Sequence, residues 1–330
     1  MRNMLPAPRP LRAACLAALV PLVAMVSPAQ AQDFPRKTVT MVVSAAPGGG
    51  LDLISRAAAR ALSEEWKQPV VVDNRGGASG VIGSELVHKS APDGYTLLTV
   101  SLSHATNPSL LKKLPYDTVS GFTPLSLFAR LPIVLVTTKS LPVNNVAELV
   151  AYARANPGKL NCGSSGTGTS QHLSCELFKV LAKVNITHVP YKGLAAASAD
   201  LLGGRIEILF DQISAASNNA RAGTVKALAV TTAARASAMP ELPTLHEAGV
   251  TGYEAVTWFG MLGPANMPRE LAGKTAADLN RAMARPEHRE RLASQNFDLV
   301  FGTPEGYDTF LKAEMAKWSK AIKDAGIQAD

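Results

Sequence analysis

The sequence predicts an α/β protein with mostly parallel sheets, and three observations support this class. Short, nearly continuous runs of Val, Ile and Leu, typical of buried parallel strands, alternate with segments of helical periodicity. About 300 residues remain beyond the first 31, a length that suits two domains rather than one. The chain has no internal repeat, low-complexity tract or long linker, so we expect two domains joined by strands that cross between them.

The expected elements follow from these runs. Strands are predicted at residues 39–43, 70–72, 95–100, 133–137, 160–163, 186–189, 206–210, 225–230 and 256–262. Helices are predicted at residues 53–66, 146–156 and 170–184. Ligands collect beyond the carboxyl ends of strands in such sheets, so the segments that follow the strands are the places to look for a site.

The first 31 residues have the pattern of a secretory signal peptide. Arg2, Arg9 and Arg12 precede an apolar stretch at residues 13–26, and Ala29-Gln30-Ala31 matches a cleavage site. We expect cleavage after Ala31, a mature chain starting at Gln32 and a periplasmic location. Cys15 lies at the start of the apolar stretch, where it does not fit a lipid anchor.

Charge argues against a nucleic-acid partner. The formal net charge of +7 falls to +4 without the three N-terminal arginines, and the remaining basic residues are scattered. A mildly basic surface favours small anions at most.

Two cysteines, Cys162 and Cys175, remain in the mature chain. An exported protein permits a disulfide between them, and a pair of buried free thiols is the alternative. No histidine stands at ligand spacing from them, so a metal site is not predicted.

A glycine loop after the first strand is the most informative motif. Pro47-Gly48-Gly49-Gly50-Leu51-Asp52 joins the strand at 39–43 to the helix at 53–66. Such a junction aims unpaired backbone N–H groups and the positive end of the helix dipole at one spot, which suits a carboxylate or phosphate. The alternative is a tight turn that only permits close packing. The spacing matches neither a dinucleotide-binding loop nor a P-loop, and no cofactor is predicted.

Two further polar segments and one acidic residue follow other strands. They are Ser101, Ser103 and Asn107 after one strand, Ser165, Gly166, Thr167, Thr169 and Ser170 after another, and Asp211 after a third. Helix capping and Asx turns are the alternative roles. The two polar segments and the glycine loop, all at strand carboxyl ends, favour one shared polar cleft.

A secreted serine hydrolase is the second hypothesis. It would use Ser165 or Ser170 as the nucleophile and His172 as the base. The chain lacks the G-x-S-x-G elbow and the H-E-x-x-H motif, which argues against a hydrolase. The receptor hypothesis assigns no catalytic residue.

Residues 34–327 resemble the Bug-type periplasmic solute-binding receptors of tripartite tricarboxylate transport systems. The matching motifs are 46–52 (APGGGLD), 68–75 (QPVVVDNR), 91–97 (APDGYTL), 107–108 (NP), 114–117 (LPYD), 165–172 (SGTGTSQH), 188–193 (HVPYKG) and 257–260 (TWFG).

The resemblance implies a two-domain periplasmic-binding-protein fold of the Venus-flytrap type II class with two interdomain crossovers. By position, residues 32–132 and 255–330 form the first domain, residues 133–254 form the second, and a helix-rich tail at 268–325 packs on the first. It implies that the loop at 47–52 and the loop at 165–171 hold ligand carboxylates, that Ser101, Ser103 and Asn107 line the wall, and that Asp211 faces the far end of the ligand.

The implied function is capture of a carboxylate-bearing small molecule, without chemistry, by a monomer that delivers it to membrane transporter subunits. Signalling to a membrane sensor kinase is the alternative output. Ser44-Ala45 and Leu51 replace an aromatic and a hydroxyl usual in the family, so we expect a ligand bulkier or less polar at one end than a dicarboxylic amino acid. Aromatic and branched acids fit this expectation. The cysteines replace residues that are often aromatic and small, which favours the disulfide.

Overall fold

The computed structural model describes Met1, residues 34–324 and residues 326–327. The chain divides into two units, Met1–Phe34 and Pro35–Asp330, and the fold below is that of the second. The predicted signal peptide and its cleavage after Ala31 fall on residues outside the described part, apart from Met1.

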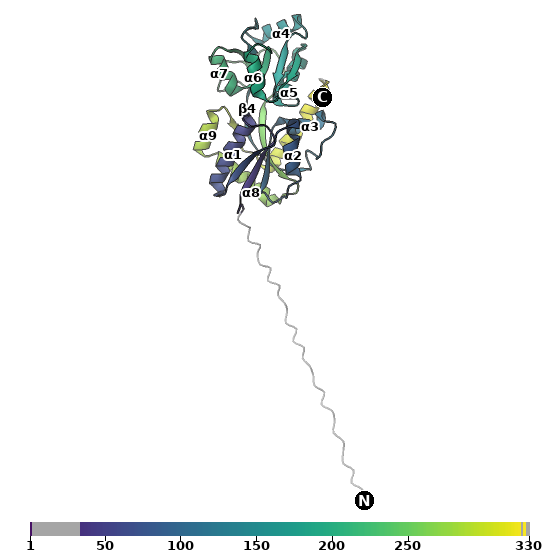
Figure 1. The fold of residues 1–330 in the computed structure, drawn as a ribbon, viewed down its shortest axis with the longest axis vertical. Helices are drawn as coiled ribbons and strands as arrows, with labels where there is room; N and C mark the ends of the chain where they lie inside the picture. The colour runs from purple at the N-terminus through teal and green to yellow at the C-terminus, as the bar shows by residue number, and fades with distance from the viewer. Residues whose placement is uncertain (2–33, 325, 328–330) are drawn as a thin grey trace. The chain divides into compact units, whose positions relative to one another are not determined.

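Strands and helices alternate along the described chain, which confirms the α/β prediction (Figure 1). The strands are β1 (Val39–Val43), β2 (Val70–Asn74), β3 (Thr96–Val100), β4 (Phe122–Leu131), β5 (Ile133–Thr138), β6 (Asn161–Ser164), β7 (Thr187–Pro190), β8 (Ile208–Gln212), β9 (Val225–Val230), β10 (Thr257–Pro264) and β11 (Asp298–Leu299). The helices are α1 (Gly50–Trp66), η1 (Ala78–Gly80), α2 (Val81–His88), α3 (Leu102–Leu110), α4 (Val146–Ala155), α5 (Ser170–Ala182), α6 (Leu194–Leu202), α7 (Ile213–Arg221), α8 (Arg269–Met283), α9 (Pro286–Ala293) and α10 (Pro304–Asp324).

The larger sheet has the strand order β11-β4-β10-β3-β1-β2. Its strand β1 pairs in parallel with β2 and β3, with Val43 opposite both Asn74 and Thr99. This register brings the carboxyl ends of three strands to one edge. The segments that leave β1, β2 and β3 therefore begin side by side.

The smaller sheet has the order β7-β6-β8-β5-β9. Strand β6 pairs in parallel with β7 and β8, and Gly163 lies opposite both Val189 and Leu209. The loop after β6 and the end of β8 therefore share an edge as well. In Figure 1, α4 to α7 surround this sheet, while α1, α2, α8 and α9 lie with the larger one.

The sheets are mixed, which corrects the expectation of mostly parallel strands. Strand β10 is antiparallel to β3 and β4, β11 is antiparallel to β4, and β5 is antiparallel to β8 and β9. The cause is the path of the chain, which leaves the larger sheet after β4, enters the smaller one at β5 and returns at β10. Strand β4 was missed because Thr123, Ser126 and Arg130 interrupt its apolar pattern.

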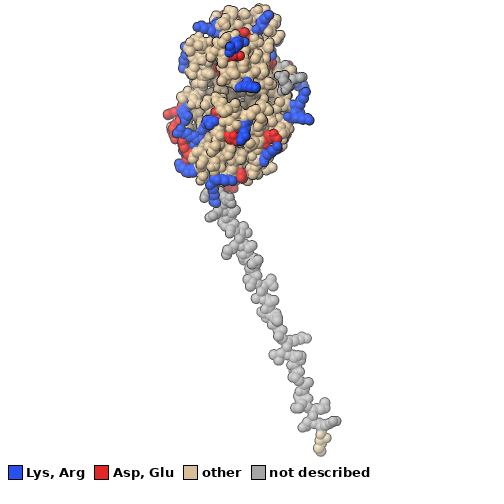
Figure 2. Space-filling view, viewed as in Figure 1, with Lys and Arg blue, Asp and Glu red and all other residues tan. Residues whose placement is uncertain are grey.

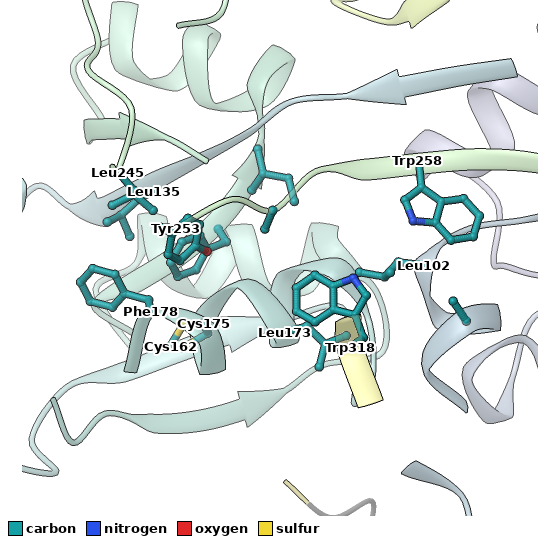
Figure 3. Close-up of a cluster of buried hydrophobic side chains, with 14 of the residues drawn as sticks. Leu102, Leu135, Cys162, Leu173, Cys175, Phe178, Leu245, Tyr253, Trp258 and Trp318 are labelled. Carbon is teal, nitrogen blue, oxygen red and sulfur yellow. The ribbon is translucent and has the colours of Figure 1, made fainter. Parts of the chain in front are cut away.

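A cluster of buried apolar side chains extends from one sheet to the other. Beside the smaller sheet it includes Cys162 of β6 and Cys175 and Phe178 of α5. Leu173 on α5 and Trp318 on α10 lie side by side and line one groove (Figure 3). The end of the predicted helical tail thus reaches α5, and the tail also contains the short strand β11.

Cys162 and Cys175 are free thiols in the structure, so the expected disulfide is not formed there. Both side chains are fully buried and lie next to each other in the cluster of Figure 3. Burial, reinforced by the neighbouring Cys175 thiol, raises the pKa of Cys162 well above its usual value. The cysteines pack as small apolar residues, a common role for buried cysteine.

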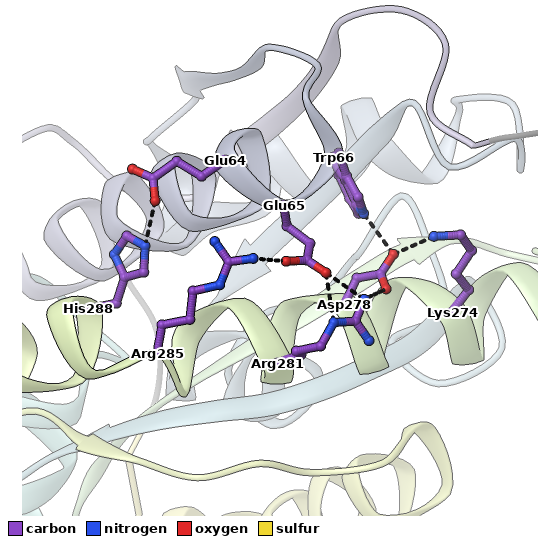
Figure 4. A network of polar contacts seen from close by, with 8 residues as sticks. All are labelled: Glu64, Glu65, Trp66, Lys274, Asp278, Arg281, Arg285 and His288. Atoms are coloured by element: carbon purple, nitrogen blue, oxygen red, sulfur yellow. Dashed lines mark hydrogen bonds and ion pairs between the residues drawn. The ribbon is translucent and has the colours of Figure 1, made fainter.

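Polar contacts fix the carboxyl-terminal end of α1 to α8 and α9 (Figure 4). Glu65 accepts hydrogen bonds from Arg281 at 2.7 Å and from Arg285. The indole of Trp66 donates to Asp278 at 2.7 Å, and His288 contacts Glu64 at 2.9 Å. Because α1 is anchored at this end, its amino terminus is held at a defined position against the larger sheet.

On the face shown in Figure 2, Lys and Arg side chains are interspersed with Asp and Glu, as the modest net charge suggests. Among the described residues, no helix combines the length and apolar character that a membrane crossing needs.

We predict that the two buried thiols are inert in the folded protein. A thiol reagent reacts with the thiolate. Burial shields both side chains from the reagent, and the raised pKa of Cys162 suppresses its thiolate form. Titration of a chain starting at Gln32 with a chromogenic disulfide should therefore detect almost no thiol in buffer and two after unfolding in denaturant. Absence of thiols in denatured, unreduced protein would instead establish a disulfide.

Candidate functional site

The first glycine loop connects β1 to α1. Gly48 has a φ of 89°, and Gly49 has an extended conformation just before the helix. Pro47 and Gly48 are exposed, and a Cβ placed on Gly49 would meet no atom within 4 Å. The first N–H groups of α1 have no partner within the helix, so this open side of the loop can accept an anion.

Asp52 braces this loop rather than facing the open side. Its buried carboxylate accepts hydrogen bonds from the Gly48 N–H at 2.9 Å, from Asn74 at 2.9 Å and from Arg56 at 3.1 Å. Burial alone raises the pKa of Asp52, but the bonds from Arg56, Gly48 and Asn74 outweigh it and hold the pKa below its usual value. The ionised side chain therefore fixes the shape of the loop.

The second glycine loop connects β6 to α5 and is braced in the same way. Gly168 donates its N–H to Nδ1 of His172 at 3.0 Å, four residues ahead, as Gly48 does to Asp52. Gly166 donates to Ser164, and the Thr169 N–H and hydroxyl both bond the Gly166 carbonyl. These groups are engaged within the loop, so the first-turn N–H groups of α5, at Ser170 and Gln171, remain for an anion.

His172 does not serve as a base for either serine. Burial, together with the neighbouring His188 ring, lowers the pKa of His172 to about 3, so the imidazole is neutral at physiological pH. Its ring stacks on His188 with centroids 3.9 Å apart, and Ser165 donates to Gln171 at 2.8 Å instead. The structure therefore lacks the serine–histidine contact that the hydrolase hypothesis requires between these residues.

A third loop, which the sequence patterns did not predict, follows β2. It contains four consecutive residues with positive φ: Gly77 at 113°, Ala78 at 46°, Ser79 at 54° and Gly80 at 87°. The loop packs against the first one, since a Cβ on Gly76 would lie 2.7 Å from the Ala46 nitrogen. The loop could have been predicted from the glycine-rich run Gly76-Gly77-Ala78-Ser79-Gly80, which follows the strand after one residue.

Contacts between these segments join elements of the two sheets. Ser79 donates to the Thr167 carbonyl at 2.9 Å, and Thr106 donates to the Gly168 carbonyl at 3.1 Å. Asn107 donates to the Ser79 carbonyl at 3.1 Å. Three of the predicted segments, containing Gly48, Asn107 and Thr167, are thereby brought together around the third loop.

Ser101 and Ser103 belong to α3 and its start. Ser101 is the residue before the helix and makes no capping bond with its side chain, while Ser103 is buried and offers its carbonyl to Thr106 at 3.3 Å. Ser101, Ser103 and Asn107 were predicted to line the wall of the site. Of these described residues, Asn107 is the one whose side chain bonds to a loop, at the Ser79 carbonyl.

Asp211 lies at the end of β8, beside the start of α1. Its neighbour Gln212 reaches Gly50 so closely that a Cβ there would lie 2.7 Å from the Gln212 Nε2. Asp211 itself is 1% exposed and accepts the Gln212 N–H at 2.8 Å. Burial raises its pKa to about 6, although the Gln212 N–H and the Ser198 hydroxyl oppose the shift.

Two mixed sheets, two crossing segments and loops that meet at strand carboxyl ends define the class of periplasmic binding proteins. Residues 54–327 match the sequence model of a protein family described as the tripartite tricarboxylate transporter family receptor. The chain belongs to this family, which consists of solute-binding receptors rather than enzymes, and its Venus-flytrap fold is as predicted.

Relatives match over most of their length. A protein from the tcbD-tcbE intergenic region of Pseudomonas sp. (strain P51) is 38% identical over 90% of this chain and 89% of its own. BugT from Bordetella pertussis is 33% identical over 92% of this chain and 93% of its own.

Solved structures agree with the fold. Rpa4515 of R. palustris, solved with adipate, is 39% identical with a TM-score of 0.85 and covers 90% of this chain and 100% of its own. MatC from Rhodopseudomonas palustris, solved with bound malate, is 30% identical with a TM-score of 0.80, over 88% of this chain and 100% of its own.

We predict that Asp211 makes stability depend on pH. A carboxyl whose pKa is raised on folding stabilises the fold fully below its unfolded value of 3.8, and this contribution is lost as pH rises through about 6. Asp211→Asn should therefore match the parent near pH 4 and exceed its free energy of unfolding by about 3 kcal/mol at pH 7.5.

Urea unfolding at both pH values measures this difference. Asp93→Asn is the control, since exposed Asp93 also accepts a backbone N–H, from Tyr95 at 3.1 Å. An Asp211→Asn effect that is the same at both pH values would contradict the assignment.

Proposed function

We propose that this chain captures a carboxylate-bearing small molecule between its two glycine loops and delivers it to the membrane subunits of a tripartite transporter. The observation that carries the proposal is the shared construction of the loops. Each loop follows a parallel strand and leads into the amino terminus of a helix. In each loop a glycine N–H donates to the side chain of the residue four positions later, which holds the loop in shape. Both loops belong to one chain, so a monomer suffices.

The domain arrangement is part of this proposal. Residues 32–132 with 255–330 form one domain, and residues 133–254 form the other. The division follows the two sheets, because β4 and β5 are separated by Pro132 alone and β9 and β10 by residues 231–256. Each domain contributes one loop, so a ligand that touches both loops favours closure.

For the ligand we propose a dicarboxylate with an apolar middle. Two helix amino termini, at α1 and α5, suit two carboxylates, and the relative Rpa4515 was solved with adipate. Leu51 is 6% exposed, so it contributes little to a pocket wall, and the open side of the first loop is formed by residues 45–49. An acid rich in hydroxyls would need additional polar partners there.

Substitution at Gly49 tests where the anion binds. A side chain at this position meets open space and an extended backbone, so the fold should tolerate it, while the side chain fills the proposed anion site. We predict that Gly49→Leu weakens adipate binding at least tenfold by calorimetry.

The matched control is Gly273→Leu, on α8, where a Cβ also meets nothing within 4 Å. It should bind adipate like the parent, and both variants should melt within a few degrees of it. Parent-like affinity in Gly49→Leu would refute the placement, whereas a parent that binds citrate or malate but not adipate would refute the ligand class.

Export is proposed from the basic start, the apolar stretch and Ala29-Gln30-Ala31. Expression of the full chain in a bacterium should give periplasmic protein whose intact mass corresponds to a start at Gln32. Periplasmic protein that retains Arg2 to Arg12 would contradict this cleavage site.

A further inference from the structure

We infer that Ser79 is a positioning residue that latches the second glycine loop over the site, together with Thr106. The inference rests on the proposed function. The latch consists of hydrogen bonds between protein groups and does not involve the ligand. Ser79 lies in the third loop, where Ala78 and Ser79 both have positive φ. Residues other than glycine rarely adopt this conformation, and it persists where surrounding contacts determine it.

Two contacts determine the conformation of Ser79. Its carbonyl accepts from Asn107 Nδ2 at 3.1 Å, and its hydroxyl donates to the Thr167 carbonyl at 2.9 Å. Asn107 is 1% exposed and belongs to α3, so it fixes the third loop from within the larger-sheet part of the chain. The hydroxyl of Ser79 then extends from that part to a loop of the smaller sheet.

Thr106 makes a second bond of the same kind. Its hydroxyl, which is buried, donates to the Gly168 carbonyl at 3.1 Å, which is closer than the Ser103 carbonyl of its own helix at 3.3 Å. Gly168 has a φ of 77° and lies so close to α3 that a Cβ would come within 2.8 Å of Leu110 Cδ1. Two successive carbonyls of the second loop are thus held by hydroxyls of η1 and α3, which connect strands of the larger sheet.

The consequence concerns how long a ligand stays bound. With the carbonyls of Thr167 and Gly168 held on the side of α3, the second loop and the first turn of α5 keep one orientation relative to the first loop. Opening of the site must break both bonds. The latch therefore slows opening and release, while the encounter with an open site is unaffected.

The test compares three variants that remove the latch with two that leave it. Ser79→Ala and Thr106→Val each delete one hydroxyl, and the double variant deletes both. Thr106→Ser keeps the donor and should rescue. Ser90→Ala removes a hydroxyl that bonds locally to the Leu86 carbonyl at 2.9 Å near the end of α2.

Stopped-flow measurement with adipate should show dissociation rates about fivefold higher for each single deletion, which corresponds to roughly 1 kcal/mol per bond. The observed association rate should rise, if it changes, because a larger share of the free protein is then open. The dissociation rate of the double variant should exceed that of either single one, and Thr106→Ser and Ser90→Ala should match the parent. Unchanged dissociation in the double variant would overturn the latch.

A measurement without ligand separates this inference from the proposed function. Small-angle scattering of the double variant alone should give a larger radius of gyration than the parent alone, since fewer bonds hold the closed arrangement. If adipate binds no variant, the ligand proposal fails while scattering still decides on the latch. Equal radii for parent and double variant would refute it.

Discussion

The interaction on which the site depends is the hydrogen bond from a loop glycine N–H to a side chain one turn into the following helix. Gly48 donates to Asp52, and Gly168 donates to His172. In each case the bond folds the loop back onto the helix start and leaves the next N–H groups directed outward, where the helix dipole adds positive potential. The acceptors differ, since Asp52 is an ion held by Arg56 and Asn74, whereas His172 is neutral. A hydrogen-bond acceptor at that position is the common requirement.

The rest of the fold positions these two helix starts. Parallel pairing of β1 with β2 and β3, and of β6 with β7 and β8, places one loop at the carboxyl edge of each sheet. The far end of α1 is fixed to α8 and α9 through Glu65 and Trp66 (Figure 4). Contacts from Ser79 and Thr106 then relate one loop to the other. A binding protein needs no catalytic group in this arrangement, and the low pKa of His172 suits a structural role.

Sequence patterns predicted the elements whose residues are mostly apolar, such as β1, β5 and β9, and two of the glycine-rich loops that follow strands. They did not predict β4, because polar residues interrupt its apolar pattern. They could not predict the direction of β10, because strand direction depends on where the chain crosses between sheets. Asp52 was predicted to line the ligand site; that its carboxylate also braces the loop could be found only from its hydrogen-bond partners. Ser79 was missed because its role comes from a left-handed backbone and from Thr167, 88 residues away. The cysteine spacing allowed a disulfide, but packing placed two thiols in the core.

A crystal structure of the parent protein with adipate would test the central claim most directly, namely that the two braced helix starts form one anion site. The account predicts one carboxylate at the N–H groups of residues 49–51 and the other at the first turn of α5, with the Gly48–Asp52 and Gly168–His172 bonds intact. Adipate bound elsewhere, for example in the cavity lined by Pro132, Thr232 and Phe297, would contradict it.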